Sequence, residues 1–261
     1  MKLEWSANIT GLFLDFEGTI NDTAKAGLRY AEGVALWLER RLPGQQADWR
    51  RAVAAALDAM REFQSRVRPG AAGGPSHEEY HRAELQVWLR TLLLTADVEL
   101  PAEIQPHDLL RAIQTEVGPE FVPTPGATTA LQALHKAGFK LFVTSGADSR
   151  YVRACLAEGG VIDLFEDIQG PDSLRLPKQG PEFFQRCLEQ AQLRADQICV
   201  IDDSAGPISW ALGMGARAVA IDLADDVLQR LKTVAGAAAL DRLRTVRNFG
   251  ELPDVLIRLQ E

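Results

Sequence analysis

The sequence predicts an α/β fold in which a doubly wound, mostly parallel sheet is interrupted by an inserted α-helical segment. Three observations support this prediction. From residue 123 onward, short apolar runs alternate with helix-like runs, the pattern of parallel strands joined by crossover helices. The strand-like runs are apolar throughout, as expected where helices cover both faces of a sheet. Between residues 22 and 122, by contrast, apolar residues repeat with helical spacing.

The strand-like and helix-like runs have definite expected limits. The first strand covers residues 11–14, where an apolar run ends at Asp15 and leads into a glycine-containing loop. Further strands are expected at 140–144, 167–169, 198–202 and 218–221. Helices are expected at 127–137, 149–158, 181–192 and 208–214, and an alanine-rich helix at 234–240. Together they predict one core built from residues 1–21 and 123–261, with residues 22–122 as the insertion.

The insertion shows helical spacing in three places. One apolar stripe recurs at steps of three and four residues and comprises Trp49, Val53, Leu57, Met60, Phe63 and Val67. A Pro/Gly-rich break at 68–75 follows, after which Ser76 is expected to cap a second helix with Glu79 as its reciprocal partner. That helix is expected to run through Leu94. A third, at 106–117, places its apolar residues on one face.

Composition argues against several classes of function. Lys and Arg number 28 and Asp and Glu number 36 among 261 residues, a net charge of −8, which disfavours nucleic acid as a partner and a polybasic membrane anchor. No apolar run approaches the roughly 18 residues of a membrane span. Cys155, Cys187 and Cys199 lack the spacing of disulfide or metal frameworks, which favours reduced thiols and a cytoplasmic location. The oligomeric state stays open.

Polar side chains follow three of the predicted strands, and ligands of open α/β sheets bind at the carboxyl ends of strands. The groups are two acids separated by one residue, a hydroxyl pair, an acid pair and a lysine before a helix: Asp15 and Glu17, Thr144 and Ser145, Asp202 and Asp203, and Lys178. A carboxylate can attack phosphorus, and carboxylates can hold Mg²⁺. Hydroxyl, backbone N–H and ammonium groups can bind the charge of a transferring phosphoryl group. The set therefore predicts metal-assisted phosphoryl transfer.

Four segments in this order resemble the motifs of the haloacid dehalogenase superfamily of phosphatases. They are Asp15-Phe16-Glu17-Gly18-Thr19, Phe142-Val143-Thr144-Ser145, Lys178 and Val200-Ile201-Asp202-Asp203-Ser204. The resemblance covers residues 10–20 and 123–222. It implies a Rossmann-like core, and it implies that the helical segment 22–122 is a cap domain of the family's first cap class.

The resemblance also implies a chemistry, the Mg²⁺-dependent hydrolysis of a small phosphorylated metabolite through an aspartyl-phosphate. Asp15 would attack phosphorus, and Glu17 would protonate the leaving oxygen and later activate water. The phosphoryl oxygens would be bound by Thr144, Ser145, Gly146 and Lys178. The Mg²⁺ ligands would be the Asp15 carboxylate, the Glu17 carbonyl, Asp203 and Asp202.

Two departures from the family pattern keep other functions open. The second acid of the first motif is usually Asp, and Glu17 in its place is a mark of the enolase-phosphatase branch. Pro207 stands where many relatives carry an acid, which leaves Asp202 as the replacement. A phosphomutase would share every motif, and a non-catalytic binding protein would fit both departures. Glu17 speaks against a dehalogenase, and Lys25, the one lysine of the insertion, gives a phosphonate hydrolase weak support.

Basic and imidazole side chains flank the Pro/Gly-rich break of the insertion: Arg66, Arg68, His77, His81 and Arg82. They fit a loop that reads the leaving group of a substrate, and they fit a solvated linker equally well. His77 and His81 are four residues apart on an expected helix and could face one metal ion, but no third ligand is evident.

Overall fold

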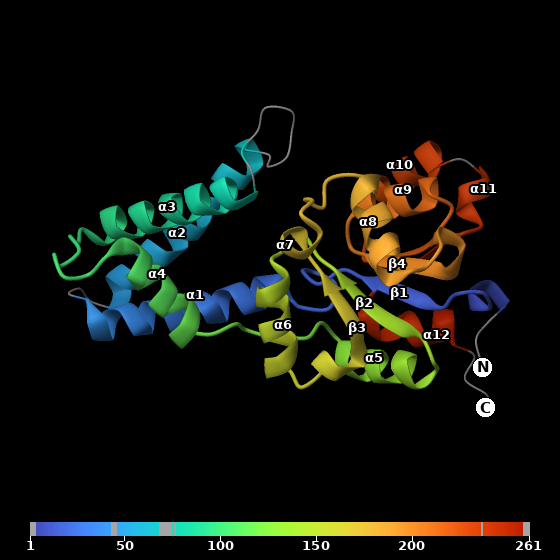
Figure 1. The fold of residues 1–261 in the computed structure, drawn as a ribbon, viewed down its shortest axis with the longest axis horizontal. Helices are drawn as coiled ribbons and strands as arrows, with labels where there is room; N and C mark the ends of the chain where they lie inside the picture. Colours follow the sequence, from blue (N-terminus) through green and yellow to red (C-terminus); the bar gives the residue numbers. More distant parts are fainter. Residues whose placement is uncertain (1–3, 43–45, 68–74, 76, 236, 258–261) are drawn as a thin grey trace. The chain divides into compact units, whose positions relative to one another are not determined.

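A six-stranded sheet organises most of the chain, whose computed structural model describes residues 4–42, 46–67, 75, 77–235 and 237–257. The strand order is β3-β2-β1-β4-β5-β6, and every neighbouring pair is parallel. The strands are β1 (Gly11–Leu14), β2 (Lys140–Thr144), β3 (Phe165–Gln169), β4 (Ile198–Asp202), β5 (Arg217–Ile221) and β6 (Leu243–Val246). The chain winds outward from β1 in both directions (Figure 1), which confirms the predicted doubly wound α/β fold.

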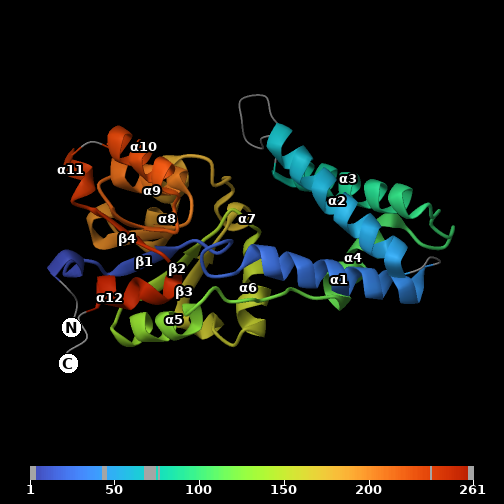
Figure 2. The ribbon, with the colours of Figure 1, turned by 180° about the vertical axis from the view of Figure 1, so that it is seen from behind.

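Each face of the sheet carries its own apolar core, because successive side chains of a strand point to opposite faces. In β1, Leu12 and Leu14 belong to one core and Phe13 belongs to the other. Helices α5 (Ala127–Lys136), α6 (Ser149–Glu158) and α12 (Leu252–Leu256) contribute to the first core. The second core is covered by α8 (Pro181–Ala191), α9 (Ala205–Gly213) and α10 (Asp225–Ala235), as Figures 1 and 2 show. Helices on both faces explain why the four inner strands, β1, β2, β4 and β5, are buried along nearly their whole length.

Short helical elements complete the first unit. They are α7 (Pro171–Leu174), α11 (Ala237–Leu240) and four 3-10 turns at Glu4–Ser6, Ile162–Leu164, Ala195–Gln197 and Phe249–Glu251.

The chain divides into two compact units, one comprising Met1–Thr23 and Phe121–Glu261 and the other Ala24–Glu120. The predicted insertion, 22–122, extends two residues further at each end. The second unit is helical and contains α1 (Thr23–Arg41), which begins one residue before it, α2 (Gln46–Arg66), α3 (His77–Ala96) and α4 (Pro106–Glu116). Helices α2 and α3 pack along each other, and the second unit has its own apolar core with Trp49 fully buried in it.

Several limits differ from the sequence-based expectations. Strand β6 was not expected, because its two central residues are exposed and polar and interrupt the apolar pattern. Helix α9 begins at Ala205, not at residue 208, because Pro207 falls in the first turn, where a missing N–H costs nothing. The alanine-rich segment is divided between α10 and α11. Residues 68–74 of the Pro/Gly-rich break and the expected cap Ser76 lie outside the described residues.

No helix within the described ranges is long and apolar enough to cross a membrane. All three cysteines are free and buried, as expected of reduced thiols.

Candidate active site

Strand register brings the polar ends of β1, β2 and β4 to one level of the sheet. Leu14 pairs with Val143 on one side and with Ile201 on the other. The next residue of each strand is therefore Asp15, Thr144 or Asp202, and the Asp15 N–H donates to the Ile201 carbonyl oxygen at 2.9 Å. Phe16 is fully buried in the apolar core, with its ring packed edge-on against Tyr151. This anchor fixes the loop that carries Asp15.

Lys178 joins the ends of all three strands. Its Nζ donates to Asp15 Oδ1 at 2.7 Å, to Asp202 Oδ2 at 2.7 Å and to the Thr144 carbonyl oxygen at 2.9 Å. Its side chain is 7% exposed and comes from the segment between α7 and α8. An ammonium group has three protons, and each has an acceptor here. Lys178 therefore has its full number of hydrogen bonds at the ends of these strands.

One ammonium between several carboxylates leaves an excess of negative charge. Burial alone would lower the pKa of Lys178, but Asp15 and Asp202 raise it above its ordinary value, so the lysine stays charged. Burial, opposed by Lys178 and reinforced by Asp15, raises the pKa of Asp202 to about 7. Burial and then Asp15 raise the pKa of Asp203. The raised pKa values of Asp202 and Asp203 show that one ammonium group does not fully offset the burial and mutual repulsion of these carboxylates.

The three carboxylates fit a divalent cation. Asp15, Asp202 and Asp203 offer oxygens that lie within 4.8 Å of one another, and they are the one such set among the described His, Cys, Asp and Glu side chains. All are hard oxygen donors, as Mg²⁺ prefers, and a 2+ charge would offset their excess negative charge. The Glu17 carboxylate is exposed and outside this set. Its expected contribution was the backbone carbonyl.

Gly18 allows Asp203 to approach the nucleophile loop. Its φ is +84°, and a Cβ built there would lie 2.1 Å from Asp203 Oδ2. The Gly18 N–H closes the turn by donating to the Asn21 carbonyl oxygen at 2.9 Å. A residue with a side chain would be strained in this conformation and would collide with the carboxylate.

Thr144 supplies a buried hydroxyl that no described residue satisfies. The residue is fully buried, and its Oγ1 has no hydrogen-bond partner in the described part of the chain. An unpaired buried hydroxyl is costly, so an absent ligand is a physical reason for it. The neighbouring Ser145 is engaged differently, since its N–H donates to the Gln169 carbonyl and its Oγ accepts from the Ala147 N–H. Gly146 is exposed, and its surroundings would admit a side chain.

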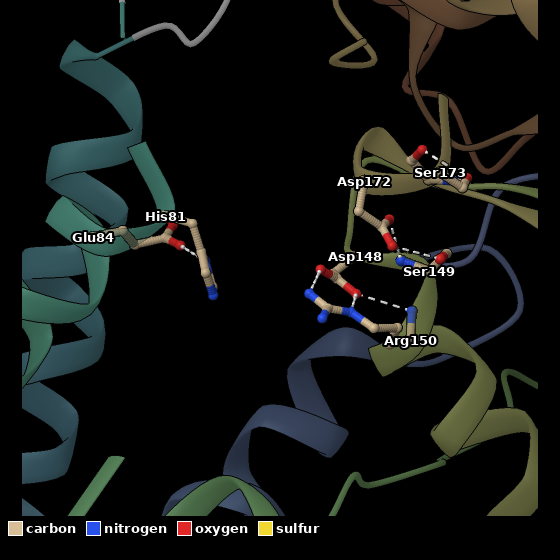
Figure 3. Close-up of polar contacts among 8 residues, drawn as sticks. His81, Glu84, Asp148, Ser149, Arg150, Asp172 and Ser173 are labelled. Carbon is tan, nitrogen blue, oxygen red and sulfur yellow. Dashed lines mark hydrogen bonds and ion pairs between the residues drawn. The ribbon is translucent and has the colours of Figure 1, made fainter. Parts of the chain in front are cut away.

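The loops after β2 and β3 are tied together by carboxylates that sequence reasoning missed (Figure 3). Asp172 accepts from both the Ser149 N–H and the Ser149 hydroxyl at 2.7 Å, and Asp148 caps α6 by accepting from the Arg150 N–H at 2.9 Å. Arg150 also returns two side-chain bonds to Asp148. The signal for Asp148 was its place before a helix. The Ser149 and Arg150 N–H groups at the start of α6 therefore both donate to carboxylates.

Two of the basic residues that flank the Pro/Gly-rich break have local acidic partners. His81 Nδ1 lies 3.3 Å from Glu84 Oε2, as Figure 3 shows, and Glu84 also accepts from Gln64 Nε2 at 2.6 Å. Arg66 pairs with Glu62 one turn earlier. Arg68 lies outside the described residues. Within this unit, the expectation of a substrate-reading loop stays a prediction.

Comparison with known proteins gives one family. The sequence model of the haloacid dehalogenase-like hydrolases matches residues 9–211. Curated relatives include the phosphoglycolate phosphatases of Vibrio cholerae, 33% identical over 91 residues (35% of this chain and 40% of that protein), and of Vibrio vulnificus, 29% identical over 125 residues (47% and 55%). (S)-2-haloacid dehalogenase 1 of Pseudomonas sp. CBS-3 is 23% identical over 142 residues (54% and 60%). The chain spans about half the length of the curated relatives it matches.

Solved structures share the fold at low sequence identity. A defluorinating L-2-haloacid dehalogenase superposes with a TM-score of 0.65 at 17% identity, covering 99% of each chain. A putative hydrolase of Bacillus subtilis, solved with bound magnesium, has a TM-score of 0.61 at 18% identity, covering 96% of this chain and 99% of its own. A predicted phosphoglycolate phosphatase of Haemophilus somnus has a TM-score of 0.55 at 17% identity, covering 95% and 98%.

Proposed function

We propose that this chain, which belongs to the haloacid dehalogenase-like hydrolases, is a Mg²⁺-dependent phosphatase that hydrolyses the phosphate monoester of a small metabolite. The observation that carries the proposal is the buried ammonium of Lys178 between Asp15 and Asp202, next to the unpartnered hydroxyl of Thr144. A nucleophilic carboxylate, a fixed positive charge and an unused donor at one strand edge suit the transfer of a phosphoryl group. Relatives named phosphoglycolate phosphatase support this class of substrate.

The proposed reaction proceeds in two displacements. An Asp15 carboxylate oxygen attacks phosphorus, the ester P–O bond breaks, and Glu17 gives its proton to the leaving oxygen. Water then attacks the aspartyl-phosphate while Glu17 takes a proton from it, which releases inorganic phosphate and restores Asp15. Lys178 offsets the charge on Asp15, and the Thr144 hydroxyl and the loop at Ser145 and Gly146 hold the phosphoryl oxygens.

A magnesium ion completes the proposal. Asp15, the Glu17 carbonyl and at least one acid of the Asp202-Asp203 pair would hold it, and it would supply positive charge to the phosphoryl oxygens when bound. The solved Bacillus subtilis neighbour that contains magnesium is in keeping with this cofactor. The helical unit Ala24–Glu120 is proposed to be the cap that selects a small substrate. The three free thiols are in keeping with a cytoplasmic location.

Dehalogenation is the second candidate, because one curated relative and several solved neighbours carry that name. It also uses a nucleophilic carboxylate. The leaving halide needs no proton, however, so Glu17 would have no task as a general acid in it. Dehalogenation would also not explain why three carboxylates lie together, since halide displacement requires no divalent cation. These two features favour the phosphatase.

One assay separates the candidates. Wild-type protein and Asp15→Asn are incubated with a panel of small phosphate esters that includes phosphoglycolate, with Mg²⁺ or with a chelator, and with 2-haloacids in parallel. Phosphate release that requires both Mg²⁺ and Asp15 is the expected result. Halide release would identify a dehalogenase, and an isomeric phosphate ester as product would identify a phosphomutase. Mg²⁺ binding with no turnover of any compound would favour a non-catalytic binding protein.

A further inference from the structure

The two acids of the Asp202-Asp203 pair have different partners. The Asp202 side chain is 2% exposed, its Oδ2 accepts from Lys178 Nζ at 2.7 Å, and its Oδ1 accepts from the Ser204 backbone N–H at 2.8 Å. Asp203 is half-buried, its Oδ1 accepts from the Ser204 hydroxyl at 3.3 Å, and its Oδ2 lies over Gly18. One acid is therefore committed to the lysine and the other faces the nucleophile loop.

The position of Lys178 depends on Asp202. With Asp202 in place, the ammonium is held between two carboxylates at equal distances of 2.7 Å and is steadied by the Thr144 carbonyl. Without the Asp202 charge, Asp15 would be the one anionic acceptor left of these three, and the ammonium would move toward it. A lysine that shifts toward the nucleophile binds the oxygen that has to attack, which lowers its reactivity.

We propose that Asp202 is a positioning residue for Lys178, and that Asp203 rather than Asp202 supplies the cation ligand of the pair. The inference rests on the proposed function, because it concerns how the same site holds its lysine and its metal. Lys178 then meets Asp15 at Oδ1 alone, and Asp15 Oδ2, to which no described residue donates, stays available as the nucleophile. One acid thus holds the lysine and the other binds the cation, whereas a sequence comparison would assign cation binding to both.

Magnesium affinity separates the two roles, and it can be measured by calorimetry with MgCl₂ alone, without turnover. Asp203→Asn is expected to weaken binding at least about tenfold, as the loss of a ligand does. Asp202→Asn alone is ambiguous, since removing any nearby negative charge weakens cation binding. The double variant Lys178→Met/Asp202→Asn removes one charge of each sign, and we expect its Kd within about threefold of wild type. A loss of about tenfold or more in this double variant would overturn the inference.

A kinetic double-mutant cycle tests whether Asp202 acts through Lys178. With the best ester and saturating Mg²⁺, single-turnover rates are compared for wild type, Asp202→Asn, Lys178→Met and the double variant. We expect Asp202→Asn to cost at least about tenfold in the wild-type background and less than about threefold once Lys178 is Met. A purely structural role predicts equal losses in the two backgrounds, and that result would overturn the inference. Asp203→Asn is the control, with similar losses in both.

The two arms keep failure of the inference distinct from failure of the proposed function. A wild-type protein that binds Mg²⁺ and hydrolyses no ester contradicts the function, while the calorimetric comparison still decides the role of Asp202. A wild-type protein that binds no Mg²⁺ overturns the cation-ligand part of both. Should Asp202→Asn unfold, the charge-balanced double variant remains usable, because removing both partners of a buried ion pair costs far less than removing one.

Discussion

Gly18→Ala is the sharpest test of how the nucleophile loop and the acid pair fit together. The added Cβ would lie 2.1 Å from Asp203 Oδ2 and 2.9 Å from its Cγ, whereas ordinary contact begins at 3.4 Å. The carboxylate oxygen must therefore retreat by about 1.3 Å, the difference between 3.4 and 2.1 Å. The left-handed backbone at φ +84° adds about 1–2 kcal/mol of strain for a residue with a Cβ.

A misplacement of this size should affect function more than folding. We expect Gly18→Ala to lose about 1–3 kcal/mol in the free energy of unfolding, which leaves the chain folded. Its kcat should fall about 10²-fold or more, because a shift of roughly 1 Å in a catalytic group costs that much. Its Mg²⁺ affinity should weaken as Asp203 moves. The assays are urea unfolding, calorimetry with MgCl₂ and phosphate release from the best ester.

Gly138→Ala is the matched control. Gly138 has the same φ of +84°, but a Cβ there meets no atom within 4 Å. It should show the backbone strain alone, with kcat and Mg²⁺ affinity unchanged. A folded Gly18→Ala protein with wild-type kcat and Mg²⁺ affinity would refute the reasoning, since Asp203 would then tolerate displacement or play no part at the site.

The remaining predictions concern single groups of the site. Asp15→Asn should reduce turnover by about 10⁴-fold or more with thermal unfolding by circular dichroism little changed, and substantial residual activity would remove the nucleophile assignment. Glu17→Asp should keep a measurable rate, whereas Glu17→Gln should lose about 10²–10⁴-fold in kcat; total loss in Glu17→Asp would show that the pocket requires the longer side chain. Thr144→Val removes a buried hydroxyl that has no hydrogen-bond partner among the described residues, so urea unfolding should show no loss of stability while turnover falls about tenfold to hundredfold. A clear loss of stability would mean that the hydroxyl has a partner in the free protein.

The core could be predicted because its signals are local. A buried parallel strand is a short apolar run, and β2 and β4 have the predicted limits to the residue. Edge strands carry a weaker signal, since one face or the outer edge meets water. Strand β3 begins two residues earlier than predicted, at Phe165, and β6 was missed altogether. The innermost strands were therefore predicted with the correct limits, whereas one edge strand was predicted too short and the other was missed.

The sequence predicts which residues form the site, but not which partner each side chain has there. Motif order identified Asp15, Thr144, Lys178, Asp202 and Asp203 as neighbours. What each carboxylate oxygen accepts depends on side-chain geometry across three strands, which no spacing encodes. The two adjacent acids therefore read alike in sequence, although Lys178 bonds one of them and Gly18 lies against the other. Asp172 was missed because its partner, Ser149, lies 23 residues away.

The central place of β1 has a consequence for how the chain is made. Its residues are synthesised before those of β2 and β4, yet Gly11 pairs with Lys140 and with Ile198, which are 129 and 187 residues further along. The helical unit 24–120 can fold in the meantime, because it is a compact unit whose residues all precede β2. Until β4 has been synthesised, β1 keeps an open hydrogen-bonding edge and exposed apolar side chains, a site for wrong pairing. The catalytic loop at its end can therefore be assembled only after β4 has been synthesised.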